Sequence, residues 1–344
     1  MTMYVKIHGM TCPNRCRHCY CWGGARRTMI PYDRIVRILR QAAALKSQFS
    51  HVIIQFFDEP TVHPRFLDIM EMQYELGVTW DGWFVPTNGY GLARMDVRGW
   101  ERLKALGNPE LQLTFYGIES DHDLFAGRAG AYADLIAAIR MAAVHEVVVT
   151  AGIVVWPGNI RKLSAIQETI RSLAEGKVSV GWFFPAWQGR GQDRDLRCRS
   201  EDCAGLNLSQ RGIKRESEHR EEIVLDDAMG SRSADDAMCS MESMEVYPDL
   251  RVVFGGACDS MVPKEYIQHF TIGRLTDGGF DPLLERLRTN PPDALRILRA
   301  MVWRDLALAY GDPEGDEMFH INDLIANKWA TAHLDSIFRK RVPR

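Results

Sequence analysis

The sequence predicts an α/β protein in which a partial (βα)6 barrel is followed by a C-terminal extension containing a β-hairpin and helices. Short apolar segments alternate six times with segments of helical periodicity between residues 3 and 184. Six such units are too few for a closed eight-stranded barrel, so an open, partial barrel is expected. After about residue 186 the chain becomes rich in charge, serine and glycine, which predicts a change of domain.

The six expected strands are largely apolar and span residues 3–8, 51–57, 82–89, 110–117, 147–155 and 177–184. The expected helices carry apolar residues at helical spacing and span residues 31–47, 64–77, 95–106, 131–145 and 160–176. Pro31 is placed to start the first helix, and Gly77 to end the second. Strict alternation implies parallel strands, with the chemistry at their carboxyl ends.

Beyond the barrel, residues 189–240 are predicted to be a long loop. Residues 244–256 predict a hairpin around a Pro-Asp turn, and residues 291–311 predict one helix, with more helix towards residue 340. The expected domains are the barrel at 1–186, a cysteine-containing extension at 187–279 and a helical segment at 280–344.

The composition is that of an ordinary soluble protein, with 344 residues, 46% of them hydrophobic, and a formal net charge of −3. This balance predicts neither a nucleic-acid nor a membrane partner. No signal peptide and no bilayer-length apolar stretch is visible in the sequence, so a cytoplasmic location is expected. In that reducing compartment, clustered cysteines indicate metal binding rather than disulfides.

Four of the eight cysteines lie in one short loop directly after the first strand. Cys12, Cys16 and Cys19 form C-x3-C-x2-C, which can hold three irons of a [4Fe–4S] cluster and leave the fourth iron open for chemistry. Zinc bound by these thiolates with Cys21 or His18 is an alternative, as are buried structural thiols. The preceding strand and the βα units that follow favour the cluster.

The cysteine loop resembles the cluster motif of the radical S-adenosylmethionine (SAM) superfamily, and the resemblance covers about residues 3–190. It implies that SAM binds the vacant iron through its amino and carboxylate groups. It also implies that an electron from the reduced cluster cleaves SAM to a 5′-deoxyadenosyl radical, which abstracts a hydrogen from a substrate. An external electron donor such as flavodoxin or ferredoxin is implied as a partner.

Two further segments resemble SAM-binding stretches of that family. The segment FFDEPTVHP at 56–64 is similar to GGEPT-x-HP, with Glu59 matching and with Phe57 and Asp58 in place of the two glycines. The resemblance implies that Glu59 contacts the SAM amino group, and the Asp58 carboxylate can serve the same ammonium. The segment PTNGYGL at 86–92 resembles the family's TNG strand end, which places Asn88 at the site.

The fourth and fifth strands complete the SAM-binding residues that the resemblance implies. In the segment 113–132, Thr114 is expected to face the SAM ribose or carboxylate, Tyr116 replaces an aspartate, and Arg128 is a candidate partner for the SAM carboxylate. His122 and Asp123 match the family's H-D pair in the same segment. His18 and Val155 are expected near the adenine ring.

The remaining cysteines lie beyond the barrel and are Cys198, Cys203, Cys239 and Cys258. Residues 239–258 resemble the start of the SPASM/Twitch extension, with Leu250 in place of its glycine, and this implies a second [4Fe–4S] cluster held by the four thiols. Some of them can instead be buried apolar thiols. Alternatively, Cys258 or Cys239 returns a hydrogen atom to a substrate radical, which would make the enzyme an epimerase.

The cysteine loop begins at residue 12, which leaves no room in this sequence for an N-terminal leader-binding domain. A small polar natural-product substrate is therefore expected: a sugar, aminoglycoside, nucleoside or amino-acid derivative that undergoes dehydrogenation, epimerisation or decarboxylation. A peptide or RNA substrate is the first alternative. A zinc-stabilised binding protein without turnover is the second.

Overall fold

The structure of the protein is a computed structural model. It describes residues 2–21, 23–24, 29–79, 84–107, 109–174, 178–206, 208, 211–234, 243–254, 264–276 and 278–339. The six predicted barrel strands are all present. They are β1 (Thr2–Met10), β2 (His51–Asp58), β3 (Phe84–Thr87), β4 (Glu110–Phe115), β5 (Val149–Val154) and β6 (Ser179–Phe183). Each ladder between them is parallel, as the alternation of strands and helices predicts.

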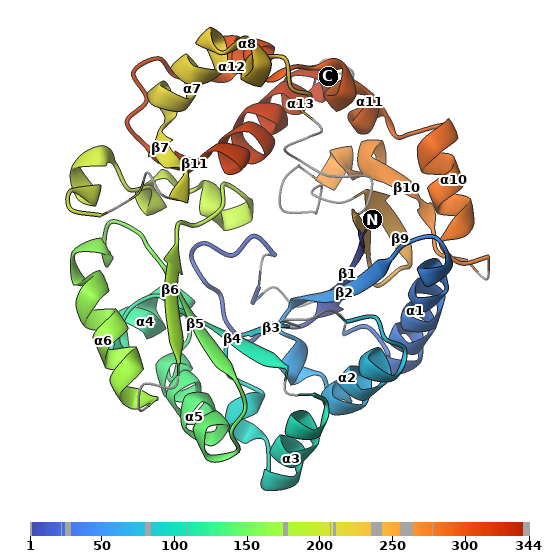
Figure 1. The fold of residues 1–344 in the computed structure, drawn as a ribbon, viewed down its shortest axis with the longest axis vertical. Coiled ribbons are helices and arrows are strands. Elements are labelled where there is room, and N and C mark those ends of the chain that lie inside the picture. The colour runs from blue at the N-terminus through green and yellow to red at the C-terminus, as the bar shows by residue number, and fades with distance from the viewer. Residues whose placement is uncertain are drawn as a thin grey trace.

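The strands fall into two hydrogen-bonded sheets, β10-β9-β8-β1-β2 and β3-β4-β5-β6. Within the described residues β2 and β3 share no ladder, so the barrel is partial, as predicted. Figure 1 shows the six strands side by side with helices outside them. The helices are α1 (Tyr32–Ala44), α2 (Phe66–Glu75), α3 (Val97–Ala105), α5 (Ala131–Val144) and α6 (Leu163–Leu173).

Alternation along β1 sorts its side chains between the two faces of the sheet. Met3, Val5 and Ile7 are completely buried in the hydrophobic cluster beneath α1. Since successive residues of a strand point to opposite faces, Lys6 and His8 face the barrel interior. This pattern places polar groups of the first strand beside the carboxyl-end site.

The predicted hairpin is confirmed as β8 (Ser243–Val246) and β9 (Arg251–Phe254), with β10 (Thr271–Arg274) beyond it. β8 lies parallel to β1, so the extension continues the barrel's own sheet. His8 Nε2 lies 3.0 Å from Glu245 Oε2 across this junction, and the His8 ring is stacked between Phe57 and Tyr247. The contact joins the barrel and the extension within the protein interior.

The prediction of a long loop over residues 189–240 is wrong for its described part. The segment contains 3-10 turns η5 (Gly189–Gln192), η6 (Arg194–Leu196) and η7 (Ser200–Cys203), then β7 (Ile213–Arg215), α7 (Glu216–Leu225) and α8 (Asp227–Gly230). Helix α7 is mostly polar, but it buries Ile223 and Glu216, whose carboxylate accepts a hydrogen bond from Trp329 Nε1 at 2.9 Å. Distant contacts therefore stabilise a helix that its own periodicity does not predict.

The single helix predicted at 291–311 is instead two helices, α11 (Asp293–Ala300) and α12 (Trp303–Tyr310). The break occurs where Met301 accepts a hydrogen bond from the Ala234 amide and Val302 pairs with Ser233. The other elements of this half are η9 (Lys264–Phe270), α10 (Asp281–Thr289), β11 (Met318–His320), the π-helical segment η10 (Asp323–Trp329) and α13 (Ala330–Arg339).

The C-terminal elements form an arc opposite the barrel strands, and the short sheet β7-β11 lies near β6 (Figure 1). Among the described residues, no helix combines the length and the apolar character needed to cross a bilayer.

Candidate functional site

The cysteine loop follows β1 at the carboxyl end of the strands, where the alternation predicts the chemistry. Cys12, Cys16 and Cys19 line one cavity of about 300 Å³ together with the ends of β2, β3 and β4. The amides of Arg15 and Arg17 donate to the carbonyls of Ala126 and Phe125, at 2.8 and 3.0 Å. These carbonyls belong to the last turn of α4 (Glu119–Ala126), a helix that the sequence did not predict, so α4 fixes the loop.

Arg190, from the segment after β6, holds the loop from the other side. Its guanidinium donates to the carbonyl of Cys16 at 3.2 Å and to that of Gly23 at 2.7 Å. Its backbone amide donates to the carbonyl of Cys19 at 3.2 Å. The loop is thus clamped between α4 and Arg190, which positions its thiols.

The surroundings of the three thiols fit an iron–sulfur cluster. The Gly23 amide donates to Cys19 Sγ at 3.1 Å, and Asn88 Nδ2 donates to Cys12 Sγ at 3.3 Å. Hydrogen bonds to cluster sulfurs are among the features that tune such centres. A Cβ at position 23 would lie only 3.3 Å from Cys19 Sγ, so glycine lets the loop close around the sulfurs.

The acidity of the thiols is consistent with metal binding. Burial raises the pKa of Cys16 to about 12, and burial also raises the pKa of Cys12 and of Cys19. A bound metal centre would compensate the three thiolate charges that burial disfavours. In the described part of the chain, no three His, Cys, Asp or Glu side chains are grouped so that they could hold a single ion.

Glu59 connects the ends of β2 and β3 next to the thiols. Its Oε1 accepts hydrogen bonds from the Thr61 hydroxyl at 2.5 Å, the Thr61 amide at 3.3 Å and the Thr87 hydroxyl at 2.6 Å. Its Oε2 accepts from the Asn88 amide at 2.5 Å. The residue is only 1% exposed, yet it lines the cavity, so one carboxylate both orders the two strand ends and faces the ligand space.

Asp58 adopts the backbone conformation that a glycine would otherwise supply. Its φ is +69°, in the left-handed region, and its carboxylate accepts a hydrogen bond from the Gly9 amide at 3.2 Å. Aspartate is among the few residues that tolerate this region. The departure from the Gly-Gly pattern therefore leaves the backbone course at this strand end unchanged.

We expect Asp58→Gly to change the free energy of unfolding by less than about 1 kcal/mol, because relief of the left-handed strain offsets the lost hydrogen bond. Asp58→Val loses the bond and places a β-branched residue at positive φ, so it should cost about 2 kcal/mol or more. Urea unfolding of the two variants measures the difference. Equal destabilisation in both would contradict the conformational role of position 58.

His18, Thr114 and Tyr116 also line the cavity, as the resemblance implies. The His18 ring lies 5.1 Å from the Tyr116 ring and 5.7 Å from the Phe125 ring, in a tilted arrangement. Burial, together with the charge of Arg197, lowers the pKa of His18 to about 4. The imidazole is therefore neutral and offers an aromatic wall to the cavity.

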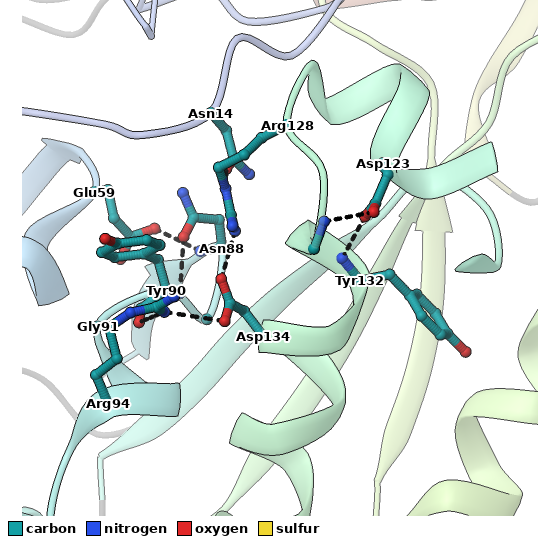
Figure 2. Close-up of polar contacts among 12 residues, drawn as sticks. Asn14, Glu59, Asn88, Tyr90, Gly91, Arg94, Asp123, Arg128, Tyr132 and Asp134 are labelled. Atoms are coloured by element: carbon teal, nitrogen blue, oxygen red, sulfur yellow. Dashed lines mark hydrogen bonds and ion pairs between the residues drawn. The ribbon is translucent and has the colours of Figure 1, made fainter. Parts of the chain in front are cut away.

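Two predicted SAM-binding residues, Arg128 and Val155, do not line this cavity. Val155 is fully buried in the core between the sheet and its helices. Arg128 donates to Asn14 Oδ1 at 2.5 Å and forms an ion pair with Asp134 at 2.7 Å (Figure 2). Because Asn14 belongs to the cysteine loop, Arg128 connects this loop to α5 instead of pointing at the ligand space.

The network of Figure 2 continues from Asp134 to Arg94 and Tyr90. The Tyr90 amide donates to Asn88 Oδ1 at 3.0 Å, and the Asn88 amide donates to Glu59. This chain of contacts orients the side chain of Asn88, whose Nδ2 donates to Cys12 Sγ. The predicted Asp123 also has a structural role, since it accepts hydrogen bonds from the amides of Gly130 and Tyr132.

His122 is buried behind Tyr116, and its neutral form is favoured. The Tyr116 amide donates to His122 Nδ1 at 3.2 Å, and the two rings are stacked at 5.0 Å. Burial lowers the pKa of His122 from 6.5 to about 4. The unfolded chain therefore takes up this proton first as the pH falls, and stability is lost between about pH 6.5 and pH 4.

Replacing His122 by Gln removes this titration. The stability advantage of the wild type over His122→Gln should be about 2 kcal/mol smaller at pH 5 than at pH 7.5, because only the wild type pays the cost of keeping this imidazole neutral. Urea unfolding at the two pH values measures the change. The other histidines are common to both proteins, so a difference that stays constant with pH would contradict the burial of a neutral His122.

The second cysteine set is only partly described. Cys198 and Cys203 are both buried in the same hydrophobic cluster as Ile160 and Leu163, and the interaction between the two thiols raises the pKa of Cys198. Cys239 and Cys258 lie outside the described residues, so the auxiliary cluster and the hydrogen-donor role of Cys258 or Cys239 stay predictions.

Sequence reasoning missed the residues that position the site. Arg190 binds the cysteine loop, Thr87 binds Glu59, and Asn14 within the loop accepts a hydrogen bond from Arg128. Asn14 lies within the cysteine loop, and Thr87 lies within the segment at 86–92. Their positions inside these motifs could have indicated a role at the site. Nothing in the sequence near Arg190 points to the loop that it clamps.

Residues 6–170 match the family profile described as the radical SAM superfamily. Among curated proteins, no sequence matches this chain. The solved structure of native anSMEcpe with bound AdoMet and Cp18Cys peptide is similar to this chain with a TM-score of 0.59 and 13% identity, over 99% of this chain and 100% of that one. Native anSMEcpe with bound AdoMet gives 0.56 and 15%, with the same coverage. At these identities the likeness shows a shared fold.

Proposed function

The chain belongs to the radical SAM superfamily, and from that premise we propose that it is an enzyme that cleaves SAM reductively and abstracts a hydrogen atom from a small polar substrate. The observation that carries the proposal is the convergence of Cys12, Cys16 and Cys19 on one cavity with Glu59 and Asn88. The three thiols would hold the cluster, and the neighbouring carboxylate of Glu59 would bind the SAM ammonium.

Cys12, Cys16 and Cys19 would hold the [4Fe–4S] cluster. When bound, that cluster supplies the electron that cleaves SAM, and the carbon radical that results takes a hydrogen from the substrate. Glu59 and Asp58 offer carboxylates at the end of β2 for the SAM ammonium, and His18 with Tyr116 offers an aromatic surface for the adenine. Arg190 and Arg128 keep the cysteine loop in position through Gly23, Cys16 and Asn14.

A second, larger cavity adjoins the first and is our candidate for the substrate. It has a volume of about 660 Å³ and is lined by the end of β6 and by residues of β7, β11 and η10. Phe183 lines both cavities, so a ligand in the larger one can reach the space next to the thiols. Pockets of this size suit small molecules.

The overall reaction depends on the fate of the substrate radical. Loss of one electron and one proton gives dehydrogenation, and return of a hydrogen atom to the opposite face gives epimerisation. Loss of carbon dioxide, followed by uptake of an electron and a proton, gives decarboxylation. We further propose that an external donor such as flavodoxin or ferredoxin reduces the cluster, and that a second cluster involving Cys198 and Cys203 handles a further electron where the reaction needs it.

The test is anaerobic purification and cluster reconstitution, followed by incubation with SAM and dithionite. The protein should be brown, contain iron and sulfide in comparable amounts, and form 5′-deoxyadenosine from SAM. A colourless protein containing zinc, without SAM cleavage, would exclude the proposal. Co-purification of a precursor peptide or an RNA would instead point to a macromolecular substrate.

A further inference from the structure

The larger cavity carries an excess of positive charge. Among its described lining residues, Lys6, Arg197 and Arg211 are cationic, and Asp323 is the one carboxylate. Asp323 is already neutralised, because it accepts hydrogen bonds from the Trp187 amide at 2.8 Å and from Asn327 Nδ2 at 2.7 Å, and lies 3.5 Å from Arg197.

Lys6 and Arg211 have no ion-pair partner in the described part of the chain. Lys6 reaches the barrel interior from β1, and its ammonium lies 5.7 Å from the centre of the Phe57 ring. Phe57 lines the cysteine cavity, so Lys6 stands where the two cavities meet. An ammonium at this junction leaves its charge available to a ligand.

The guanidinium of Arg211 is held in place but not neutralised. It stacks 4.0 Å above the Trp182 ring and donates one hydrogen bond to the Trp182 carbonyl at 2.7 Å. Its remaining donors form the planar fork that matches carboxylate and phosphate. Trp182 thus presents this fork in a fixed orientation at the cavity wall.

Arg197 supplies a third, buried cation. It is 4% exposed, and its guanidinium carbon lies 5.0 Å from the centre of the Trp187 ring and 5.1 Å from that of the Phe319 ring. Its Nε has no hydrogen-bond partner among the described residues. Arg197 lies 3.5 Å from Asp323 and donates to the Gly191 carbonyl at 2.7 Å, so these two opposite charges offset one another and Lys6 and Arg211 make up the excess positive charge of the cavity. The low-dielectric walls of a cavity strengthen the attraction of such charges for an anion.

We propose that the substrate carries an anionic group, a phosphate or a carboxylate, which binds Lys6 and Arg211. This inference rests on the proposed function and narrows its substrate class. Among the expected substrates, the cavity selects acidic sugars, nucleotides or amino-acid derivatives and disfavours polycationic aminoglycosides. The amide groups of Gln188 and Asn327, joined by a 2.7 Å hydrogen bond, offer polar contacts to the rest of the molecule.

The experiment uses the cluster-loaded full chain with SAM present, so that the cysteine cavity is filled. Inorganic phosphate is the probe, and the width of its ³¹P resonance is followed at constant ionic strength. Wild-type protein should broaden the resonance, and Lys6→Met or Arg211→Met should weaken phosphate binding about tenfold, since each removes a charged donor. Arg98→Met removes an exposed cation on α3 without touching the cavity, and it should bind phosphate like the wild type.

Malonate in a second arm distinguishes the two anions. If malonate displaces phosphate at lower concentration than phosphate itself requires, the site prefers a carboxylate; if it fails to displace phosphate, the site selects a phosphate. Both results support an anionic substrate. Three results would overturn the inference. Neither anion binds, or all variants bind phosphate equally well, or a polycation such as neomycin binds the cavity and displaces phosphate from it.

SAM cleavage measured on the same preparation separates this inference from the proposed function. Cleavage of SAM without anion binding would contradict only the inference that the substrate is anionic. Anion binding without any SAM cleavage would remove only the proposed function. Circular dichroism of each variant establishes that it folds, and two independent substitutions keep the test valid if one of them fails.

Discussion

Replacing Cys12, Cys16 and Cys19 together by alanine should reduce SAM cleavage by at least about a thousandfold, to background, because the bound cluster carries the hard chemistry. The fold should survive largely intact. The two large hydrophobic clusters of the barrel include none of these three side chains. Cys16 belongs to a small third cluster with Tyr116 and Phe125, and Cys19 packs against it, so we expect a modest loss of stability without loss of the fold. Formation of 5′-deoxyadenosine measures the first effect, and circular dichroism with thermal unfolding measures the second.

Cys21→Ala is the matched control for this experiment. Cys21 is buried in the same loop but lies outside the C-x3-C-x2-C spacing. If the three thiols hold an iron–sulfur cluster, Cys21→Ala should retain iron and SAM cleavage. If Cys21 completes a zinc site, both the triple variant and Cys21→Ala should lose metal and unfold, which would contradict the cluster assignment.

Iron analysis of the triple variant also decides whether a second cluster exists. One cluster's worth of iron remaining in this variant would establish an auxiliary site. Adding Cys198→Ala and Cys203→Ala should then remove that iron, if these adjacent buried thiols are among its ligands. Complete loss of iron in the triple variant would favour free thiols in the extension.

The barrel was predictable because its signals are local. Each of the six strands is an apolar segment followed by a helical one, and this alternation alone implies the parallel arrangement that the ladders show. Helix α7 and the break between α11 and α12 were missed because Trp329 and Ala234, far away in the chain, stabilise them. The pairing of β8 with β1 was also missed, because strand partners separated by more than 200 residues leave no periodic signal.

The candidate site likewise contains residues that local motifs predict and residues that depend on distant contacts. Cys12, Glu59 and Asn88 belong to short motifs whose spacing reflects their chemistry, and the structure brings them to one cavity. Arg190 was not predictable, since it binds backbone carbonyls 174 and 167 residues away. Carbonyl groups are present at every position, so a sequence does not show which of them needs a distant arginine.

Glu59→Gln should weaken SAM binding by about tenfold or more and lower the free energy of unfolding by about 2 kcal/mol. The carboxylate accepts four hydrogen bonds from Thr61, Thr87 and the Asn88 amide. A glutamine NH2 group would meet some of these donors, and it has no charge to offer an ammonium. Glu59→Ala should cost about 4 kcal/mol, because it leaves buried donors without an acceptor.

A near-isosteric control separates the two roles of Glu59. Thr61→Val removes a hydroxyl donor to Glu59 at a position that does not line the cysteine cavity, so it should lower stability while SAM affinity changes little. SAM affinity is measured by equilibrium dialysis, and stability by urea unfolding of the same proteins. If Glu59→Gln binds SAM as tightly as the wild type, the carboxylate only joins β2 to β3, and the ammonium must bind elsewhere, with Asp58 the nearest carboxylate in the chain. The structure favours weaker SAM binding by Glu59→Gln, because Glu59 lines the cavity in addition to accepting hydrogen bonds from the Thr61 and Thr87 hydroxyls and from the Thr61 and Asn88 amides.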